Sequence, residues 1–147
     1  MESTVKQMLA AKDIQEIFTL KPDDTVLDAI KLMAAKNIGA LPVMEDDILI
    51  GIFSERDYTR IFPLKRQEPE TTPVSEVMTN EVYCISPENS ACDCMGLMTE
   101  KRIRHLPVLS DQGKLVGIIT IGDVLKTVIK DQEILIGHLE YYIQGKA

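Results

Sequence analysis

The stretch Gly51-Ile-Phe-Ser-Glu-Arg-Asp57 occurs a second time in this chain, as Gly117-Ile-Ile-Thr-Ile-Gly-Asp123. Each copy is an apolar, strand-like run that ends in a hydroxyl residue, with a carboxylate three positions further on. A repeat has to be identified before any other feature, because it shows how many copies of one supersecondary unit build the fold. The pair predicts that the chain contains two versions of the same unit.

The similarity extends on both sides of these stretches. Leu-Pro-Val stands ahead of each copy, at 41–43 and 106–108, and equivalent residues keep a constant spacing over most of the chain. The spacing grows by one residue in the turn 110–113, where insertions are well tolerated. We therefore predict an α/β (α+β) fold of two pseudo-symmetric β-α-β-β-α repeats that pack sheet to sheet.

Hydrophobic periodicity places the individual elements. Apolar residues at helical spacing predict helices over 1–12, 25–37, 54–62 and 133–144. Short β-branched and apolar runs predict strands over 14–20, 41–44, 48–54 and 82–85. The predicted domain organisation is a first repeat over 8–62, a linker rich in Pro and charge over 63–73, a second repeat over 74–131 and a C-terminal helix over 132–147.

Composition excludes several classes of function. The net charge of -7 argues against a nucleic-acid partner held by bulk electrostatics. No apolar run is long enough to span a membrane, and the N-terminus lacks a secretory signal, so we expect a cytoplasmic chain with reduced thiols. His105 and His138 lie far apart in the sequence, and no metal site is predicted.

The Ser/Thr-x-x-Asp pattern has two interpretations. It occurs at four places, Thr25/Asp28, Ser54/Asp57, Ser90/Asp93 and Thr120/Asp123, and helix capping is the interpretation that the pattern alone favours. The copies at 54 and 120 also follow a Gly-led strand. A helix that begins there offers free N–H groups to a phosphate, and its carboxylate can accept the hydroxyls of a ribose. The combination fits a nucleotide.

The paired strings, each with Leu-Pro-Val ahead of it, resemble the cystathionine-β-synthase (CBS) domain, and two in tandem resemble a Bateman module. The resemblance covers roughly residues 8–131. It implies a stand-alone regulatory module, not an enzyme, that binds an adenine nucleotide (AMP, ADP, ATP or NAD, and in some members S-adenosylmethionine) in the clefts between its repeats. It also implies a homodimer and an unknown target protein.

The resemblance assigns the ligand-binding residues by position. Asp57 and Asp123 match the carboxylates that hold ribose, and Ser54 and Thr120 match the hydroxyls near the phosphate. Strand-end positions that line the adenine pocket and the stretches around each Leu-Pro-Val complete the set. The predicted ligand-binding residues are Thr19, Gly39, Ala40, Leu41, Pro42, Ser54, Arg56, Asp57, Cys84, Arg104, His105, Leu106, Pro107, Thr120 and Asp123.

The two repeats differ in their basic residues. Arg104 stands three positions before Pro107, where the resemblance implies a phosphate contact, whereas the first repeat has Gly39 at the matching place. Conversely, Arg56 is matched by Gly122 in the second repeat. Both arginines also have an interpretation as solvated charges at helix ends. If they do bind phosphate, the two clefts are unequal.

Two alternative functions remain open. An enzyme could use Ser54 or Cys84 as a nucleophile, but the sequence contains no Gly-x-Ser-x-Gly, Walker or Gly-x-Gly-x-x-Gly motif. A nucleotide-free scaffold or dimerisation module would use the four Ser/Thr-x-x-Asp strings only to cap helices.

Overall fold

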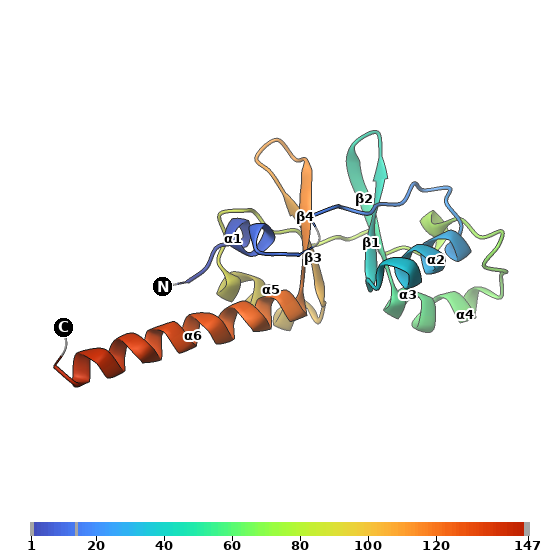
Figure 1. Cartoon of the computed structure of the whole chain (residues 1–147). Coiled ribbons are helices and arrows are strands. Elements are labelled where there is room, and N and C mark those ends of the chain that lie inside the picture. Colours follow the sequence, from blue (N-terminus) through green and yellow to red (C-terminus); the bar gives the residue numbers. More distant parts are fainter. Residues whose placement is uncertain (1, 14, 146–147) are drawn as a thin grey trace. The chain divides into compact units, whose positions relative to one another are not determined.

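The computed structural model describes residues 2–13 and 15–145. They form two compact units. The first-repeat unit is Glu16–Tyr83, and the second-repeat unit combines Met1–Gln15 with Cys84–Ala147. Each unit holds one antiparallel β-hairpin with helices beside it (Figure 1). The predicted mixed α and β class is confirmed.

The elements of each unit follow in chain order. The first-repeat unit contains α2 (Val26–Lys36), β1 (Ala40–Glu45), β2 (Ile48–Ser54), α3 (Glu55–Arg60), α4 (Phe62–Lys65) and the 3-10 helix η1 (Val74–Glu76). The second-repeat unit contains α1 (Val5–Ala10), α5 (Ala91–Lys101), β3 (His105–Leu109), β4 (Leu115–Thr120) and α6 (Ile121–Ile143). The predicted helices at 1–12 and 25–37 and both strands of the first hairpin are confirmed within the described residues.

Local sequence explains where the hairpins turn and where α2 ends. Asp46 and Asp47 join β1 to β2 with φ of 51° and 63°, the left-handed geometry of a two-residue hairpin turn. The longer turn of the second hairpin uses Gly113, at φ 76°. Asn37 ends α2 at φ 54°, a conformation that Asn tolerates better than most residues.

The predicted strands at 14–20 and 82–85 are wrong for the described residues. Residue 14 lies outside them, and each segment retains one parallel bridge, Leu20 to Val43 or Ile85 to Val108. The Leu20 N–H donates to the Pro42 carbonyl at 2.9 Å, and the Leu20 carbonyl accepts from the Met44 N–H at 2.8 Å.

Prolines explain why this ladder stops after one residue. Extension in one direction would need an N–H from Pro42, and extension in the other would need one from Pro22. Proline has no N–H, so neither bond can form. Pro107 and Pro87 impose the same limit around Ile85 in the second-repeat unit.

The segment 63–73 is more than the predicted linker. Its start belongs to α4, and its later part covers the N-terminus of α2. The carbonyl of Thr72 accepts from the N–H of Val26 at 2.9 Å, and that of Pro69 accepts from Leu27 at 3.0 Å. These bonds satisfy donors that the first turn of a helix leaves unpaired.

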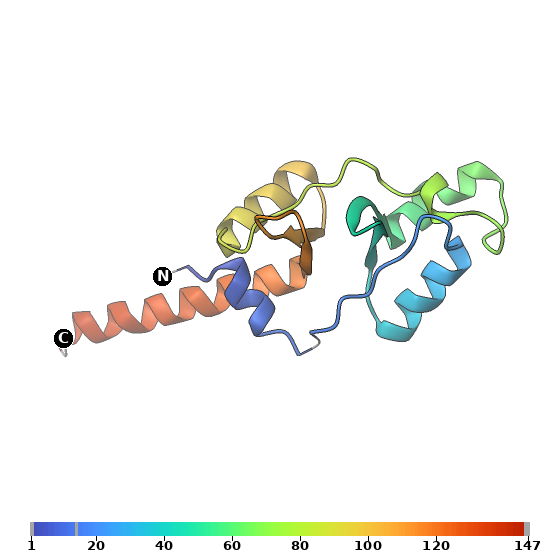
Figure 2. The same cartoon turned by 90° about the horizontal axis from the view of Figure 1, so that it is seen from above.

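The helix predicted at 133–144 is the second half of one long helix, α6, which begins at Ile121. No proline interrupts this stretch, so the helix that Thr120 caps continues without a break. Its first half packs on α5 and α1, where Val124 is buried (Figures 1 and 2). Across residues 2–13 and 15–145, α6 included, no helix has both the length and the apolar character that crossing a membrane requires.

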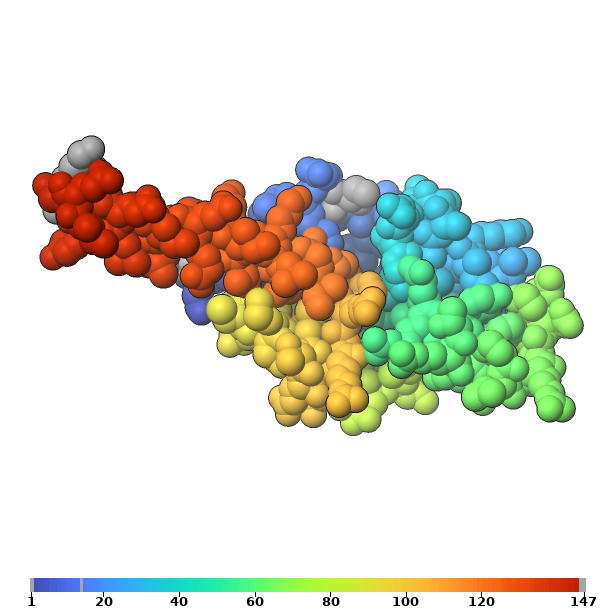
Figure 3. Space-filling view, turned by 90° about the horizontal axis from the view of Figure 1, so that it is seen from below, coloured from blue at the N-terminus to red at the C-terminus, as the bar shows by residue number. Residues whose placement is uncertain are grey.

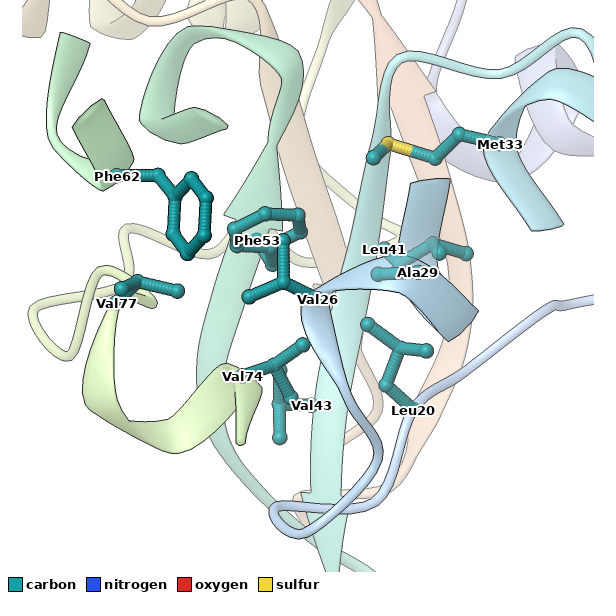
Figure 4. Close-up of a cluster of buried hydrophobic side chains, with 10 residues drawn as sticks. All are labelled: Leu20, Val26, Ala29, Met33, Leu41, Val43, Phe53, Phe62, Val74 and Val77. Atoms are coloured by element: carbon teal, nitrogen blue, oxygen red, sulfur yellow. The ribbon is translucent and has the colours of Figure 1, made fainter. Parts of the chain in front are cut away.

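The core of the first-repeat unit lies between its hairpin, α2 and the segments that follow β2. Phe53 of β2 is fully buried there and faces Phe62 of α4 and Val77 (Figure 4). The buried cluster consists of Leu20, Val26, Ala29, Met33, Leu41, Val43, Phe53, Phe62, Val74 and Val77. A two-stranded hairpin is marginal by itself, so this burial from other elements is what stabilises it.

Each hairpin also has a short segment docked on a glycine of its second strand. A Cβ placed on Gly51 would lie 2.4 Å from the sulfur of Met78, and one on Gly117 would lie 2.6 Å from Cδ2 of Leu9. Such distances are far below van der Waals contact. The two glycines therefore permit the close approach of residues 74–79 in one unit and of α1 in the other.

We predict that Gly51→Ala lowers the free energy of unfolding by about 1–3 kcal/mol, because Met78 must move out of its packed position. Gly96→Ala is the matched control. Gly96 lies inside α5 with no atom within 4 Å of an added Cβ, so alanine should stabilise by roughly 0.5–1 kcal/mol. Urea unfolding of both variants measures the difference, and equal effects would show that Met78 does not occupy this position in solution.

Candidate functional site

All four Ser/Thr-x-x-Asp strings form capping boxes, which confirms the capping interpretation for each of them. In the copy at the end of β2, the Asp57 N–H donates to the Ser54 hydroxyl oxygen at 3.2 Å, and the Ser54 N–H donates to the Asp57 carboxylate at 2.9 Å. In the second copy, the Asp123 N–H donates to the Thr120 hydroxyl oxygen at 3.1 Å, and the Thr120 N–H donates to the Asp123 carboxylate at 2.9 Å. The hydroxyl and the carboxylate of each motif are thus fixed at the start of a helix.

Asp57 has a further partner from a distant part of the chain. The hydroxyl of Thr79 donates to Oδ1 of Asp57 at 3.1 Å, while Oδ2 accepts from the Ser54 hydroxyl at 3.1 Å. Asp57 is only 6% exposed. A buried carboxylate needs such donors, because an unpaired charge in this position is costly.

Asp123 has a partner of a different kind. The ammonium group of Lys12 lies 3.0 Å from Oδ2 of Asp123 and forms an ion pair with it. The same nitrogen donates to the carbonyl of Ile118 at 3.0 Å. The two side chains are 27% and 24% exposed, so this pair is partly shielded from solvent.

The first hairpin brings the predicted residues 39–42 beside the Ser54 motif. Ala40 pairs with Ser54 across the sheet, and the carbonyl of Gly39 accepts from the Glu55 N–H at 3.0 Å. Ala40, Leu41 and Pro42 are buried. Arg56 is exposed on α3, immediately before Asp57.

The second hairpin repeats this arrangement. His105 pairs with Thr120, and the carbonyl of Arg104 accepts from the Ile121 N–H at 2.9 Å. Leu106 and Pro107 are buried, whereas the side chain of Arg104 is exposed. The structure therefore gathers residues 104–107 at the start of α6, together with the Thr120 motif.

Thr19 and Cys84 lie at the isolated bridges next to the hairpins. Thr19 is exposed and precedes Leu20, which bonds to Pro42. Cys84 is half-buried and precedes Ile85, whose N–H donates to the Pro107 carbonyl at 3.0 Å. Burial raises the pKa of the Cys84 thiol, so little thiolate forms at neutral pH and the thiol is a poor nucleophile.

Sequence reasoning missed two residues at these motifs, Thr79 and Lys12. A signal for Thr79 exists, because it follows an apolar segment, 74–78, that resembles residues 5–9 of α1. No sequence pattern indicates Lys12, since its contact depends on where α1 docks. In the part of the chain that the structure describes, no group of three or more His, Cys, Asp and Glu side chains could hold a metal ion.

The chain matches the CBS domain family model twice, over residues 11–63 and 74–130. A solved protein with CBS domains from Burkholderia ambifaria MC40-6, provisionally assigned to signal transduction, is 51% identical with a TM-score of 0.83, over 88% of this chain and 96% of that one. The solved CBS domain pair of the protein MJ0100, in complex with 5-methylthioadenosine and S-adenosyl-L-methionine, shares the fold at 21% identity and a TM-score of 0.77, over 89% of this chain and 99% of that one.

Among curated proteins, the CBS domain-containing protein CBSX3, mitochondrial, of Arabidopsis thaliana is 41% identical over 128 residues. The match covers 84% of this chain and 62% of the relative. Inosine-5'-monophosphate dehydrogenase of Methanocaldococcus jannaschii is 36% identical over 86% of this chain, which spans only 25% of that enzyme.

We predict that Asp57→Ala lowers the free energy of unfolding by about 1.5–3 kcal/mol, because it removes hydrogen bonds to a buried charged group. Asp28→Ala is the control, since Asp28 sits in the same kind of capping box but is exposed, and it should cost less. Thr79→Val should reproduce part of the Asp57 loss, because it removes one of the donors. Denaturant unfolding measures all three, and equal losses at Asp57 and Asp28 would contradict the assigned role of Thr79.

Proposed function

This chain belongs to the CBS domain family, and we propose that it is a regulatory module that binds an adenine nucleotide and catalyses no reaction itself. The ligand is AMP, ADP, ATP or NAD, with S-adenosylmethionine as a further adenosine compound to test. Occupancy of the motifs changes how the module packs and so how it acts on a target protein. We place this activity in the cytoplasm.

The observation that carries the proposal is the duplicated set of groups at the two strand ends. Each set combines a hydroxyl, a carboxylate and a basic residue: Ser54, Asp57 and Arg56 in one unit, and Thr120, Asp123 and Arg104 in the other. A carboxylate suits the two hydroxyls of a ribose, and an arginine suits a phosphate. The residues predicted from the sequence as ligand-binding remain our proposed contacts.

A protein of the same fold supports the ligand class. The MJ0100 domain pair was solved with two compounds that both contain adenosine. At 21% identity it shares the fold with this chain, so it supports adenosine recognition by this fold and not particular contacts here.

The enzyme alternative receives less support from the geometry. The hydroxyl of Ser54 donates to a carboxylate within its own capping box, and burial raises the pKa of the Cys84 thiol. The raised pKa disfavours a nucleophilic thiolate at Cys84, and the hydroxyl oxygen of Ser54 is occupied in its capping box, where it accepts from the Asp57 N–H.

The scaffold alternative has one specific observation in its favour. All four Ser/Thr-x-x-Asp strings act as helix caps, and Asp57 is already bonded on both oxygens by residues of the chain itself. Oδ2 of Asp57 already accepts from both the N–H and the hydroxyl of Ser54, but Oδ1 accepts from Thr79 and can take a second hydrogen bond, so capping and ribose binding through Oδ1 are compatible. Native mass spectrometry of the purified protein distinguishes the two functions, since a nucleotide that co-purifies with it would exclude an empty scaffold.

We predict different effects for the carboxylates and the arginines in titration calorimetry with adenosine, AMP and ATP. Asp57→Ala and Asp123→Ala should weaken all three ligands, because all three contain the ribose. Arg56→Ala and Arg104→Ala should weaken AMP and ATP by roughly ten- to hundredfold and leave adenosine unchanged, since a hydrogen bond to a charged group contributes about 1.5–3 kcal/mol. If adenosine binding falls as far as ATP binding does in the arginine variants, the phosphate assignment is wrong.

We also propose that the module forms a homodimer through α6. Exposed side chains, apolar at every position except Gln132, recur along this helix at alternating spacings of four and three residues, the pattern of a two-helix seam. Among the residues of its unit that the structure describes, no other segment covers the second half of α6 in the views of Figures 1 and 3. The seam consists of Leu125, Ile129, Gln132, Ile136, Leu139 and Ile143, all of them exposed.

The occupant that fits this seam is a second α6 in antiparallel orientation. In the register that sets Ile129 against Leu139 of the other copy, Lys126 comes opposite Glu140 on the flank of the seam. A parallel pair would place no opposite charges across the seam. In the antiparallel register Gln132 lies opposite the apolar Ile136 of the other copy, so its amide has to hydrogen-bond to solvent at the edge of the seam.

We predict that the wild-type chain has twice the monomer mass in light scattering and that Ile136→Lys has the monomer mass, because a charge in the seam cannot be buried. Leu64→Lys is the control, since Leu64 is 80% exposed outside α6. Lys126→Glu should weaken the dimer, and Glu140→Lys added to it should restore it. A monomeric wild type, or a dimer that Ile136→Lys leaves intact, would refute the seam.

A further inference from the structure

The short segments ahead of the two repeats dock in the same way, which allows a residue-by-residue comparison. Val5, Met8 and Leu9 of α1 correspond in sequence to Val74, Val77 and Met78. Leu9 lies against Gly117 and Met78 lies against Gly51, which are themselves equivalent glycines of β4 and β2. The residues that follow each segment therefore arrive at equivalent places beside the two motif carboxylates.

In the first-repeat unit, the neutral residue Thr79 fills this place. Its N–H donates to the carbonyl of Ile52 at 2.8 Å, and its hydroxyl donates to Oδ1 of Asp57 at 3.1 Å. The hydroxyl of Thr79 is a neutral donor, so this contact brings no cation to Asp57.

In the second-repeat unit, one ammonium group replaces both donors. The sequence position equivalent to Thr79 is Ala10, which has no hydroxyl. Lys12 instead donates to the carbonyl of Ile118, the counterpart of Ile52, and to Oδ2 of Asp123, both at 3.0 Å. The charge of this carboxylate is therefore neutralised by a side chain of the same unit.

We propose that Lys12 is a specificity-determining residue of the second motif, which makes this motif discriminate against adenosine in favour of its phosphorylated forms. The inference rests on the proposed function. A ribose that uses both oxygens of Asp123 has to compete with Lys12 for Oδ2. Adenosine offers the displaced ammonium no new partner, whereas a phosphate does. Lys12 thus supplies a cation to the motif in which Gly122 stands in the place of Arg56.

Calorimetry tests this in an Asp57→Ala background, so that the carboxylate of the first motif does not contribute. Lys12→Met keeps the length of the aliphatic stem and removes the charge. We expect it to strengthen adenosine binding and to weaken ADP binding. The dissociation constant for adenosine divided by that for ADP should therefore fall by about tenfold. Lys6→Met, an exposed lysine of α1, should leave the ratio unchanged, and Lys12→Arg should preserve it.

A second measurement needs no ligand. Unfolding of Lys12→Met, Asp123→Asn and the double variant forms a double-mutant cycle, and a contact in solution requires a coupling between the two substitutions. Coupling together with a lowered ratio supports the inference. Absence of coupling, or coupling with an unchanged ratio, overturns it while the wild type still binds nucleotide. If the wild type, shown free of ligand by mass spectrometry, binds none of these compounds, the proposed function fails and the inference fails with it.

Discussion

The close approach of a short segment to a glycine on the second strand is the contact on which each unit depends. Two paired strands are too small to be stable, and α1 in one unit and residues 74–79 in the other supply part of the missing apolar cover. The segments can do this because Gly51 and Gly117 have no Cβ where Met78 and Leu9 lie. The same docking places Thr79 beside Asp57 in one unit and Lys12 beside Asp123 in the other. In each unit, one contact therefore determines both the packing of the hairpin and the partner of the motif carboxylate.

The duplicated pattern was sufficient to predict the hairpins, the helix caps and most helix positions. These features depend on neighbouring residues, such as Thr25 before α2 or Asn37 after it, and the sequence displays them directly. The strands predicted at 14–20 and 82–85 failed for a reason that the sequence also contains. Apolar character indicates burial, but Pro42 and Pro22 remove the N–H groups that a parallel ladder around Leu20 would need.

Other features could not be predicted from the sequence. α6 is continuous across residue 132, where the predicted domain boundary divides it, because no proline separates its two halves; the repeat pattern ends at 131 and gives no information about this continuation. The pairing of Lys12 with Asp123 joins residues more than a hundred positions apart, through a long side chain whose direction is set by the docking of α1. The gathering of residues 39–42 and 104–107 beside the motifs follows from the register of the two hairpins, which pairs Ala40 with Ser54 and His105 with Thr120.

The helix that Thr120 caps is also the helix that carries the exposed seam. α6 has 23 residues, which at about 1.5 Å per residue makes a rod of about 35 Å. A tilt of about 5° where this rod begins displaces its far end by about 3 Å, as simple lever geometry on that length requires. A rearrangement of less than an ångström around Asp123 that tilts α6 therefore displaces Ile143 by a larger distance, with no bending of the intervening turns.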